Sequence, residues 1–449
     1  MKSNLKAGFA KVNINPSMGI PLRGYYKERF ADGVLDDLEA IALALECDGV
    51  KALLISIDHC GIEQELSAQY RKTVSEATKI PEEHIIISST HTHTAPFAEP
   101  DSENERVREY TEFLGKRIVD AAVFAVADLK EARMGYGKGV APNVAFIRRY
   151  VMKDGSLMTN PGVNNPDIVR PAGLVDDSVN VLRFDREGAE TIVFVNFANH
   201  PDVVGGSKIS ADWSGLLRKN VEKILDGTRC VFFNGAQGDV NHVNVHPEGG
   251  DLNGMFIDFD NVARGYSHAQ YIARVITGGV LQAYDKVNYV DVDNVISKQK
   301  TIRIPSNKPT SEELPEAHII NDLHNAGRDN ELPYEGMMLT TVVAEAARMV
   351  FLENGPDAFD MRLSAIKIGP VVILGIPGEP FTAIGTALKD TEGFDMIIPC
   401  CNSNGKEGYF PMQDSYDEGG YEARSSRFKA GVGEYIIKEG KDLIKSLEE

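Results

Sequence analysis

Two histidines separated by one residue, His91 and His93, are the sharpest candidates for chemistry in the sequence. They follow the stretch His84 to Ser89, whose apolar residues predict a β-strand. Residues two apart in extended backbone share a face. Both imidazoles can therefore bind one metal, or one can bind while the other transfers a proton. The same pattern also fits two histidines that are only hydrogen-bonded in a loop.

A third histidine and a glutamate also follow predicted strands. His200 comes after the apolar run Val193 to Phe197, and Glu379 comes after the run Val371 to Ile376. Taken alone, His200 is more typical of a core or capping residue. Two histidines and a glutamate together, however, form a known ligand set of catalytic zinc. Zinc lowers the pKa of bound water to about 7, so this set predicts hydrolysis at neutral pH.

Two loops can bring further groups to such a metal. The segment 234–241 follows the predicted strand Val231 to Phe233, and its glycines allow the backbone to approach a substrate closely. A tight turn is the alternative reading. The segment Cys401 to Phe428 is rich in glycine and tyrosine, and a phenol near zinc can bind the metal or donate to an oxyanion. Tyr409 and Tyr421 are therefore candidates, although tyrosines in such loops commonly only pack.

The elements that must position these residues alternate between strands and helices. This alternation predicts an α/β fold with a large, mixed, twisted sheet flanked by helices, and a site on loops that follow strand ends. Apolar residues recur at helical spacing in Val107 to Ala127, and we also expect helices in Tyr266 to Tyr284 and in a polar stretch around Leu339 to Glu353. The segment Ala141 to Pro171 predicts an irregular, site-lining stretch. Further expected strands are Ala7 to Asn13, Ala40 to Cys47, Ala52 to Asp58, Thr191 to Phe197, Cys230 to Phe233 and a strand pair in Tyr289 to Ile304.

Composition narrows the class of protein. With 43% apolar residues, the chain of 449 residues has enough material for a buried core. A net charge of -19 disfavours nucleic acid as a partner. No run reaches the roughly 18 to 20 apolar residues of a membrane span, and the amino terminus lacks the apolar stretch of a secretory signal. We therefore expect a cytoplasmic protein without an integral membrane segment, whose five cysteines are reduced and buried.

The motifs resemble, in their order and approximate spacing, those of the neutral (non-lysosomal) ceramidase family. The matching segments read Thr90-His91-Thr92-His93-Thr94-Ala95-Pro96, Asn199-His200-Pro201, Gly238-Asp239-Val240-Asn241 and Pro377-Gly378-Glu379. The resemblance implies one ceramidase-like catalytic domain over residues 1–449. It also implies a zinc ion bound by His91, His200, Glu379 and Tyr409. By the same resemblance, His93, Arg148 and Tyr421 line the active site, with Arg149 adjacent to Arg148.

Two departures from the family concern the substrate. Asn241 stands where the ceramidases carry the serine of Gly-Asp-x-Ser-Pro, and an asparagine cannot act as a nucleophile, although it can donate to a carbonyl or an oxyanion. The chain also ends soon after the tyrosine loop, where the ceramidases continue into an immunoglobulin-like domain. We therefore expect an amide of a small-molecule or lipid-like N-acyl substrate to be cleaved, rather than ceramide. Metal-activated water would attack, His93 would move the proton, and Arg148, Tyr421 and Asn241 would stabilise the oxyanion.

Two other classes of function remain open. The protein could be a non-catalytic metal- or ligand-binding homologue of the ceramidase fold, a reading that Asn241 motivates. Alternatively, two histidines and a carboxylate also form the ligand set of non-haem iron, so redox chemistry with iron or manganese is a third reading. The sequence leaves open the substrate, the native metal, the oligomeric state and the pathway.

Overall fold

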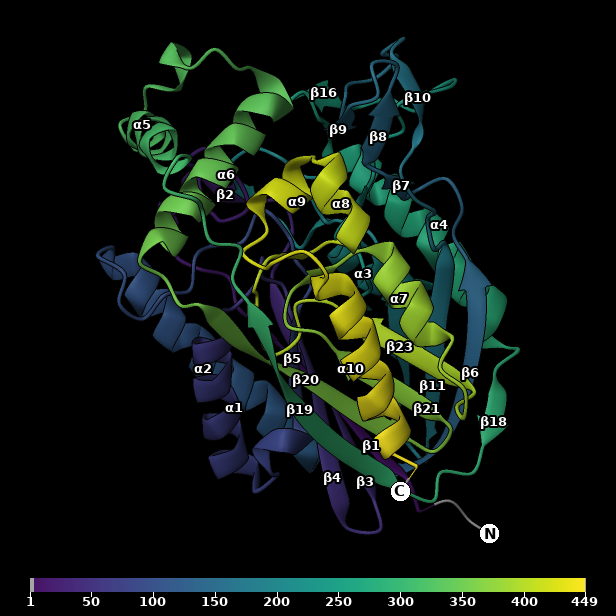
Figure 1. The fold of residues 1–449 in the computed structure, drawn as a ribbon. Coiled ribbons are helices and arrows are strands. Elements are labelled where there is room, and N and C mark those ends of the chain that lie inside the picture. The colour runs from purple at the N-terminus through teal and green to yellow at the C-terminus, as the bar shows by residue number, and fades with distance from the viewer. Residues whose placement is uncertain (1–3, 449) are drawn as a thin grey trace.

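Two β-sheets pack face to face, and helices cover the outer side of each (Figure 1). The structure is a computed structural model and describes residues 4–448. The larger sheet runs, from one edge to the other, through β14 (Thr228–Asn234), β12 (Thr191–Phe197), β11 (Ser178–Arg186), β6 (Lys130–Val140), β1 (Lys6–Asn13), β3 (Glu39–Cys47), β4 (Val50–Ile57) and β5 (Ile85–Ser89). The smaller sheet runs through β19 (Val295–Pro305), β20 (Ala358–Ile368), β21 (Val371–Gly375) and β23 (Met396–Cys400).

Both sheets are mixed. The pairs β4–β5, β12–β14 and β21–β23 are parallel, and the other neighbours in the two sheets are antiparallel. A large mixed sheet flanked by helices confirms the expected fold class. The sequence did not predict the second sheet. It explains why strands such as β12 and β21 are largely apolar and almost fully buried, since both of their faces are covered.

Ten α-helices lie in the described residues. They are α1 (Gln64–Thr78), α2 (Glu105–Ala127), α3 (Asp212–Ile224), α4 (Tyr266–Tyr284), α5 (Leu314–Asn325), α6 (Gly336–Glu353), α7 (Thr382–Lys389), α8 (Gln413–Glu418), α9 (Tyr421–Ser425) and α10 (Val432–Ser446). Helices α1 and α2 cover the β1–β3–β4–β5 half of the larger sheet, and α3 and α4 cover its other half. Helices α7 and α10 cover the smaller sheet.

The larger sheet folds over on itself. Its two halves are joined where β1 pairs with β6 through only Lys6–Glu131 and Ala7–Lys130. Ser56 of β4 donates a hydrogen bond to the Phe232 carbonyl of β14, with a distance of 2.7 Å, although these strands belong to opposite halves. The fold-over brings the ends of β4, β5, β12 and β14 close together.

Short strands complete the structure around these ends. They are β2 (Gly33–Val34) with β13 (Lys208–Ile209), β7 (Phe146–Ile147) with β15 (Val240–Asn241), β8 (Arg149–Met152) with β9 (Leu157–Thr159) and β10 (Ile168–Pro171), β16 (Phe256–Ile257) with β17 (Ala263–Arg264), and β22 (Glu379–Pro380) with β24 (Tyr409–Phe410). The segment expected to be irregular, Ala141 to Pro171, thus contains four short strands. Two strands do occur in the segment Tyr289 to Ile304, but the prediction that they pair with each other is wrong. Strand β18 (Asn288–Val290) pairs with β6, and β19 pairs with β20.

Two expectations drawn from composition can be compared with the structure. All five cysteines are buried and none forms a disulfide, as expected. Within residues 4–448, no helix combines the length and the apolar character that crossing a membrane requires.

Candidate metal centre

Three of the predicted metal ligands follow strand ends and meet in the interior. His91 follows β5, His200 follows β12, and Glu379 follows β21. Each of these strands belongs to a parallel pair, and the carboxyl ends of parallel strands are the usual position of sites in α/β sheets. The fold-over of the larger sheet explains why His91 and His200 meet although β5 and β12 lie in different halves of it.

The side-chain atoms of these residues form a tight triangle. His91 Nε2 lies 3.1 Å from His200 Nε2 and 3.2 Å from Glu379 Oε2. The distance from His200 Nε2 to Glu379 Oε2 is 3.6 Å. All three residues are buried, with at most 3% of their surface exposed. The arrangement is a group of donor atoms that could hold a metal ion.

Backbone carbonyls fix the two imidazoles in the orientation of metal ligands. His91 Nδ1 faces the Cys60 carbonyl at 2.5 Å, and His200 Nδ1 faces the Gln237 carbonyl at 3.2 Å. A carbonyl can only accept, so each Nδ1 carries the proton and each Nε2 presents a lone pair. Two such lone pairs and a carboxylate oxygen pointing at one another repel unless a cation lies between them. The donor set therefore fits a divalent metal such as zinc.

The electrostatics of the triangle favour a positive charge at its centre. Burial opposes the protonation of His91, but Glu379 and Cys60 outweigh it and raise the pKa of His91 to about 10. Burial and Arg148 lower the pKa of His200 well below its usual range. Burial also opposes ionisation of Glu379, yet His91 and His200 hold its pKa well below the usual value. The ionised carboxylate thus pairs with one positive charge, which is a proton on His91 when no metal is bound and the metal ion, with both imidazoles neutral, when one is bound.

His91 adopts an unusual backbone conformation. Its φ angle is +77°, in the left-handed region that non-glycine residues rarely occupy. Its N–H donates to the His59 carbonyl at 2.9 Å, which holds the turn in place. Such backbone strain gathers at functional sites because the surrounding structure is needed to maintain it.

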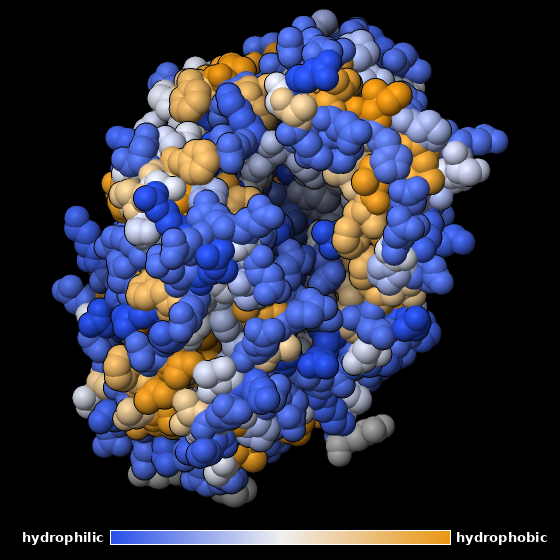
Figure 2. Space-filling model, turned by 90° about the vertical axis from the view of Figure 1, so that its left-hand side faces the viewer, coloured by the Kyte–Doolittle hydropathy of each residue, from blue (hydrophilic) through white to orange (hydrophobic). Residues whose placement is uncertain are grey.

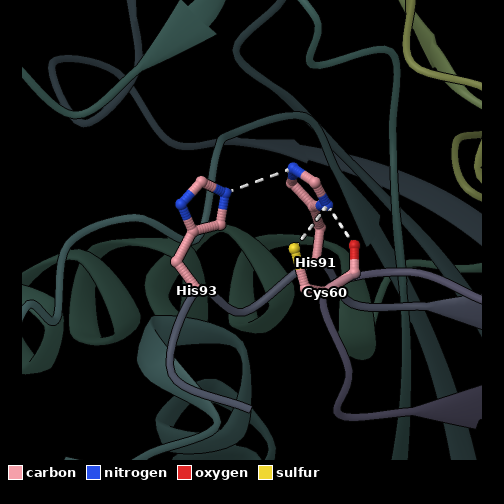
Figure 3. Close-up of side chains that lie close together, drawn as sticks. All are labelled: Cys60, His91 and His93. Carbon is pink, nitrogen blue, oxygen red and sulfur yellow. Dashed lines mark hydrogen bonds between the residues drawn. The ribbon is translucent and has the colours of Figure 1, made fainter. Parts of the chain in front are cut away.

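His93 lies beside the triangle and has a different partner. Its Nε2 is 3.3 Å from His91 Nε2, and Figure 3 shows the His93 ring directed at His91, with the Cys60 thiol and carbonyl near the other nitrogen of His91. Its Nδ1 is 3.4 Å from Asp202 Oδ1. Burial opposes ionisation of Asp202, but Arg264, 2.8 Å away, holds the pKa of Asp202 well below its usual range. Asp202 was not predicted, although it stands two residues after His200.

The predicted tyrosines and arginine cluster on one side of the triangle. Strands β22 and β24 pair in parallel and place Tyr409 opposite Glu379. The Tyr409 ring stacks near His200, with ring centroids 6.5 Å apart, and contacts Tyr421 edge-on at 5.5 Å. The Arg148 guanidinium lies 5.4 Å from the centre of the Tyr409 ring and 5.9 Å from that of Tyr421.

Arg148 and its neighbour Arg149 face different surroundings. Arg148 is buried, binds Glu422 at 2.6 Å and donates to the Gly238 carbonyl at 2.8 Å. Arg149 instead donates to Ser415 and to the Gly419 carbonyl, away from the tyrosine pair. Of the two arginines, Arg148 is therefore the one beside the tyrosines.

Asn241 lies apart from this group. Its side chain donates to Asn160 Oδ1 at 2.8 Å and accepts from the Val243 N–H at 3.0 Å. It does not line the cavity described next. Its role as a donor to an oxyanion therefore stays a prediction. The same loop contributes Gln237, which sequence reasoning missed and whose Nε2 lies 3.4 Å from Glu379 Oε2.

A cavity of about 290 Å³ opens beside the triangle. His91, His93, Glu379, Tyr409 and Tyr421 line it, so the structure brings these predicted residues into one pocket. No sequence motif marks the other charged residues of its wall, which are Arg23, Glu63, Lys406, Glu407 and Arg427. Figure 2 shows the side of the molecule that carries α2 and α6, where the surface is hollowed and bordered by hydrophilic residues on one side and by several hydrophobic residues on the other.

Comparisons with known proteins address the fold. No protein-family model matches the sequence, and no curated protein matches it. Among solved structures, neutral ceramidase from Pseudomonas aeruginosa superposes with a TM-score of 0.74 and 16% identity, over 100% of this chain and 75% of that one. A ceramidase complexed with C2 superposes with a TM-score of 0.72 and 16% identity, over 99% of this chain and 75% of that one. The resemblance inferred from the motifs is thus confirmed at the level of architecture, and the chain has the fold of neutral ceramidase.

Proposed function

We propose that the protein is a metal-dependent hydrolase that uses zinc to cleave the amide bond of an N-acyl compound other than ceramide. The observation that supports this proposal is the convergence of His91 Nε2, His200 Nε2 and Glu379 Oε2 beside a cavity. Two histidines and a carboxylate leave a position open for a reacting group, which distinguishes catalytic from structural zinc sites. The shared fold with neutral ceramidase supports the same class of reaction by analogy.

Each residue of the site then has a role that follows from its contacts. His91, His200 and Glu379 would hold the metal, with Tyr409 as the proposed fourth ligand, and the reacting water would take a further position, as catalytic zinc can expand to five ligands. When bound, zinc supplies a nucleophile at neutral pH by lowering the pKa of water to about 7. His93 has its Nε2 at the cavity and its Nδ1 near a carboxylate, so it can accept a proton and later deliver it to the leaving amine. Arg148 and Tyr421 are the proposed stabilisers of the oxyanion.

Metal content tests the centre of this proposal without a substrate. We expect near-stoichiometric zinc in the wild-type protein, purified without chelator or histidine tag, and its loss in a His91→Ala, His200→Ala double variant. Inductively coupled plasma mass spectrometry measures both. A His246→Ala, His318→Ala double variant removes two histidines outside the site and serves as the matched control.

Activity tests the rest of the proposal. The zinc-loaded protein is assayed on a panel of N-acyl amides and matched esters, and we expect amide hydrolysis that disappears with the metal. If the wild type and the His91→Ala, His200→Ala variant both contain negligible metal, the proposed metal centre would be refuted. A metal-loaded protein that hydrolyses nothing would instead favour the non-catalytic binding function.

A further inference from the structure

The wall of the cavity carries three cationic side chains from three separate segments. Arg23 lies in the loop after β1, Lys406 lies between β23 and β24, and Arg427 follows α9. They face the same cavity as the donor atoms of His91 and Glu379. Three cations around one cavity are unexpected in a chain whose net charge is -19. A cavity shaped for neutral alkyl chains would not require these charges, because buried cations are unfavourable in apolar surroundings.

Two of the three cations have no carboxylate in direct contact, although the Glu63 carboxylate lies near all three. In residues 4–448, neither Lys406 nor Arg427 forms an ion pair, and the Arg427 guanidinium only lies over the Phe351 ring, 4.7 Å from its centre. Arg23 binds Glu63 through Nη2 at 2.8 Å, while its buried Nη1 has no hydrogen-bond partner and only a long ion pair, at 3.8 Å, with Glu99. Buried cationic donors without partners are costly unless a ligand supplies the acceptors.

Lys406 is fixed in place by the packing of its stem. A Cβ atom added to Gly61 would lie 2.3 Å from Cδ and 2.5 Å from Cγ of Lys406. The aliphatic part of the Lys406 side chain therefore packs against Gly61, which has no side chain, next to Cys60 and the proposed metal centre. Burial and the neighbouring Arg23 lower the pKa of Lys406, as expected for an ammonium group held without a compensating anion.

The carboxyl groups of the wall leave the cations largely uncompensated. Glu63 is already engaged with Arg23, and Glu379 belongs to the metal centre. Glu407 lines the same wall, but within residues 4–448 it forms no ion pair with any of the three cations. The cavity volume, about 290 Å³, lies at the lower end of ligand pockets, which span about 300 to 1,000 Å³.

We propose that Arg23, Lys406 and Arg427 form an anion-binding subsite, and that the substrate is a small N-acyl compound bearing a carboxylate or a phosphate near the scissile bond. This inference rests on the proposed hydrolase function and names its substrate class. The subsite would hold the charged end of the molecule while the acyl group lies at His91 and Glu379. An uncharged sphingolipid would leave the three cations unsatisfied.

Matched pairs of probes that differ only in the anion test the subsite. N-acetyl amino acids are compared with their uncharged carboxamides, and N-acetylglucosamine 6-phosphate is compared with N-acetylglucosamine. Titration calorimetry of the zinc-loaded protein gives Kd, and kinetics give KM for any probe that is hydrolysed. We expect the anionic member to bind about ten- to hundredfold more tightly, as one or two charge-assisted hydrogen bonds provide. The natural anion is a carboxylate if the ratio of Kd values is larger for the amino acid pair, and a phosphate if it is larger for the sugar pair.

Substitutions show whether the preference comes from these residues. In Lys406→Met and Arg427→Met, we expect each preference to fall about tenfold while zinc content and circular dichroism match the wild type. Two separate variants keep the test valid if one of them does not fold. Lys429→Met removes an exposed lysine two positions from Arg427, outside the cavity, and should keep the wild-type preference.

The outcomes separate this inference from the function on which it rests. Equal binding of the charged and uncharged probes, or a preference that both substitutions leave unchanged, would overturn the subsite. Hydrolysis of the anionic amides with the wild-type kcat/KM in both variants would retain the hydrolase and likewise reject the subsite. Selective anion binding without hydrolysis of any probe would retain the subsite and refute the hydrolase.

Discussion

The three histidines of the site differ in the partner of their Nδ1 atoms. His91 and His200 face backbone carbonyls, which hold a neutral imidazole with its Nε2 lone pair free for a metal. His93 faces the carboxylate of Asp202, at 3.4 Å, and a carboxylate stabilises a protonated imidazole. Two histidines are thus suited to coordination and the third to proton transfer.

The His93→Gln variant tests this division of roles. We expect it to retain zinc while kcat falls about 10²- to 10⁴-fold, the usual contribution of general acid–base catalysis. Metal analysis and steady-state kinetics on a confirmed substrate provide the two measurements, and His246→Gln, at an exposed position, is the control. Full turnover in His93→Gln would refute its role in proton transfer, and loss of zinc would make it a ligand instead.

At the scale of elements, the strands predicted before the ligands are the ones that position them. The runs that became β5, β12 and β21 are apolar and short, so His91, His200 and Glu379 could be predicted to follow strand ends. The fold-over of the larger sheet could not be predicted, because it depends on tertiary contacts such as that between Ser56 and Phe232.

Other parts of the site lack a local signal. Strand β6 contains glycines and charged residues, and its place between β11 and β1 is set by its neighbours rather than by an apolar pattern. Asp202 and Lys406 acquire their roles only from what they contact after folding. No periodicity marks such residues, so the motifs predict the proposed metal ligands but not the cations of the cavity wall.

The loop between β14 and β15 makes a close contact that can be tested. A Cβ atom on Gly238 would lie 2.4 Å from the Glu379 carbonyl oxygen, and the Gly238 N–H already donates to the Pro380 carbonyl at 2.9 Å. In Gly238→Ala, the loop and β22 must therefore move apart. We expect zinc to bind about 10- to 100-fold more weakly, the typical effect of disturbing the support of a metal ligand.

Competition with a chromogenic chelator measures this affinity. The matched control is Gly278→Ala in α4, where an added Cβ meets no atom within 4 Å. Because Gly278 lies outside the metal centre, this variant should keep the wild-type zinc affinity. It should also gain up to about 1 kcal/mol of stability, since alanine is the better helix former. Unchanged zinc affinity in Gly238→Ala would show that the loop does not support Glu379.

At the scale of the whole molecule, the core between the sheets draws buried residues from both of them, including Leu43 of β3 and Ile373 of β21. This shared core supports our proposal that residues 1–449 form one catalytic unit. The cytoplasmic location remains a prediction of the sequence. The oligomeric state is open.

Buried histidines make the stability of the whole fold depend on pH. Burial lowers the pKa of His242 to about 3, and its Nε2 lies 2.6 Å from the Ala263 carbonyl. Between pH 6.5 and 3 the unfolded chain thus binds a proton at this residue that the native state does not, so the free energy of unfolding falls as the pH falls. The loss amounts to about 1.4 kcal/mol on going from pH 7.5 to 5.5.

Urea unfolding in the presence of a chelator measures this contribution. We expect the difference in unfolding free energy between pH 7.5 and 5.5 to be about 1.4 kcal/mol smaller in His242→Gln than in the wild type. The exposed His246 provides the control, because His246→Gln should keep the wild-type pH dependence. An identical pH dependence in His242→Gln and the wild type would contradict the prediction.

The proposed ligands His91, His200 and Glu379 come from the first, middle and last parts of the chain. An unfolded chain cannot hold them together, so a metal would bind the native state almost exclusively. At a free concentration 1,000 times the Kd, such binding adds about 4 kcal/mol to the free energy of unfolding. Metal supply would then govern how long the protein survives proteolysis in the cell, because proteases act on the unfolded fraction.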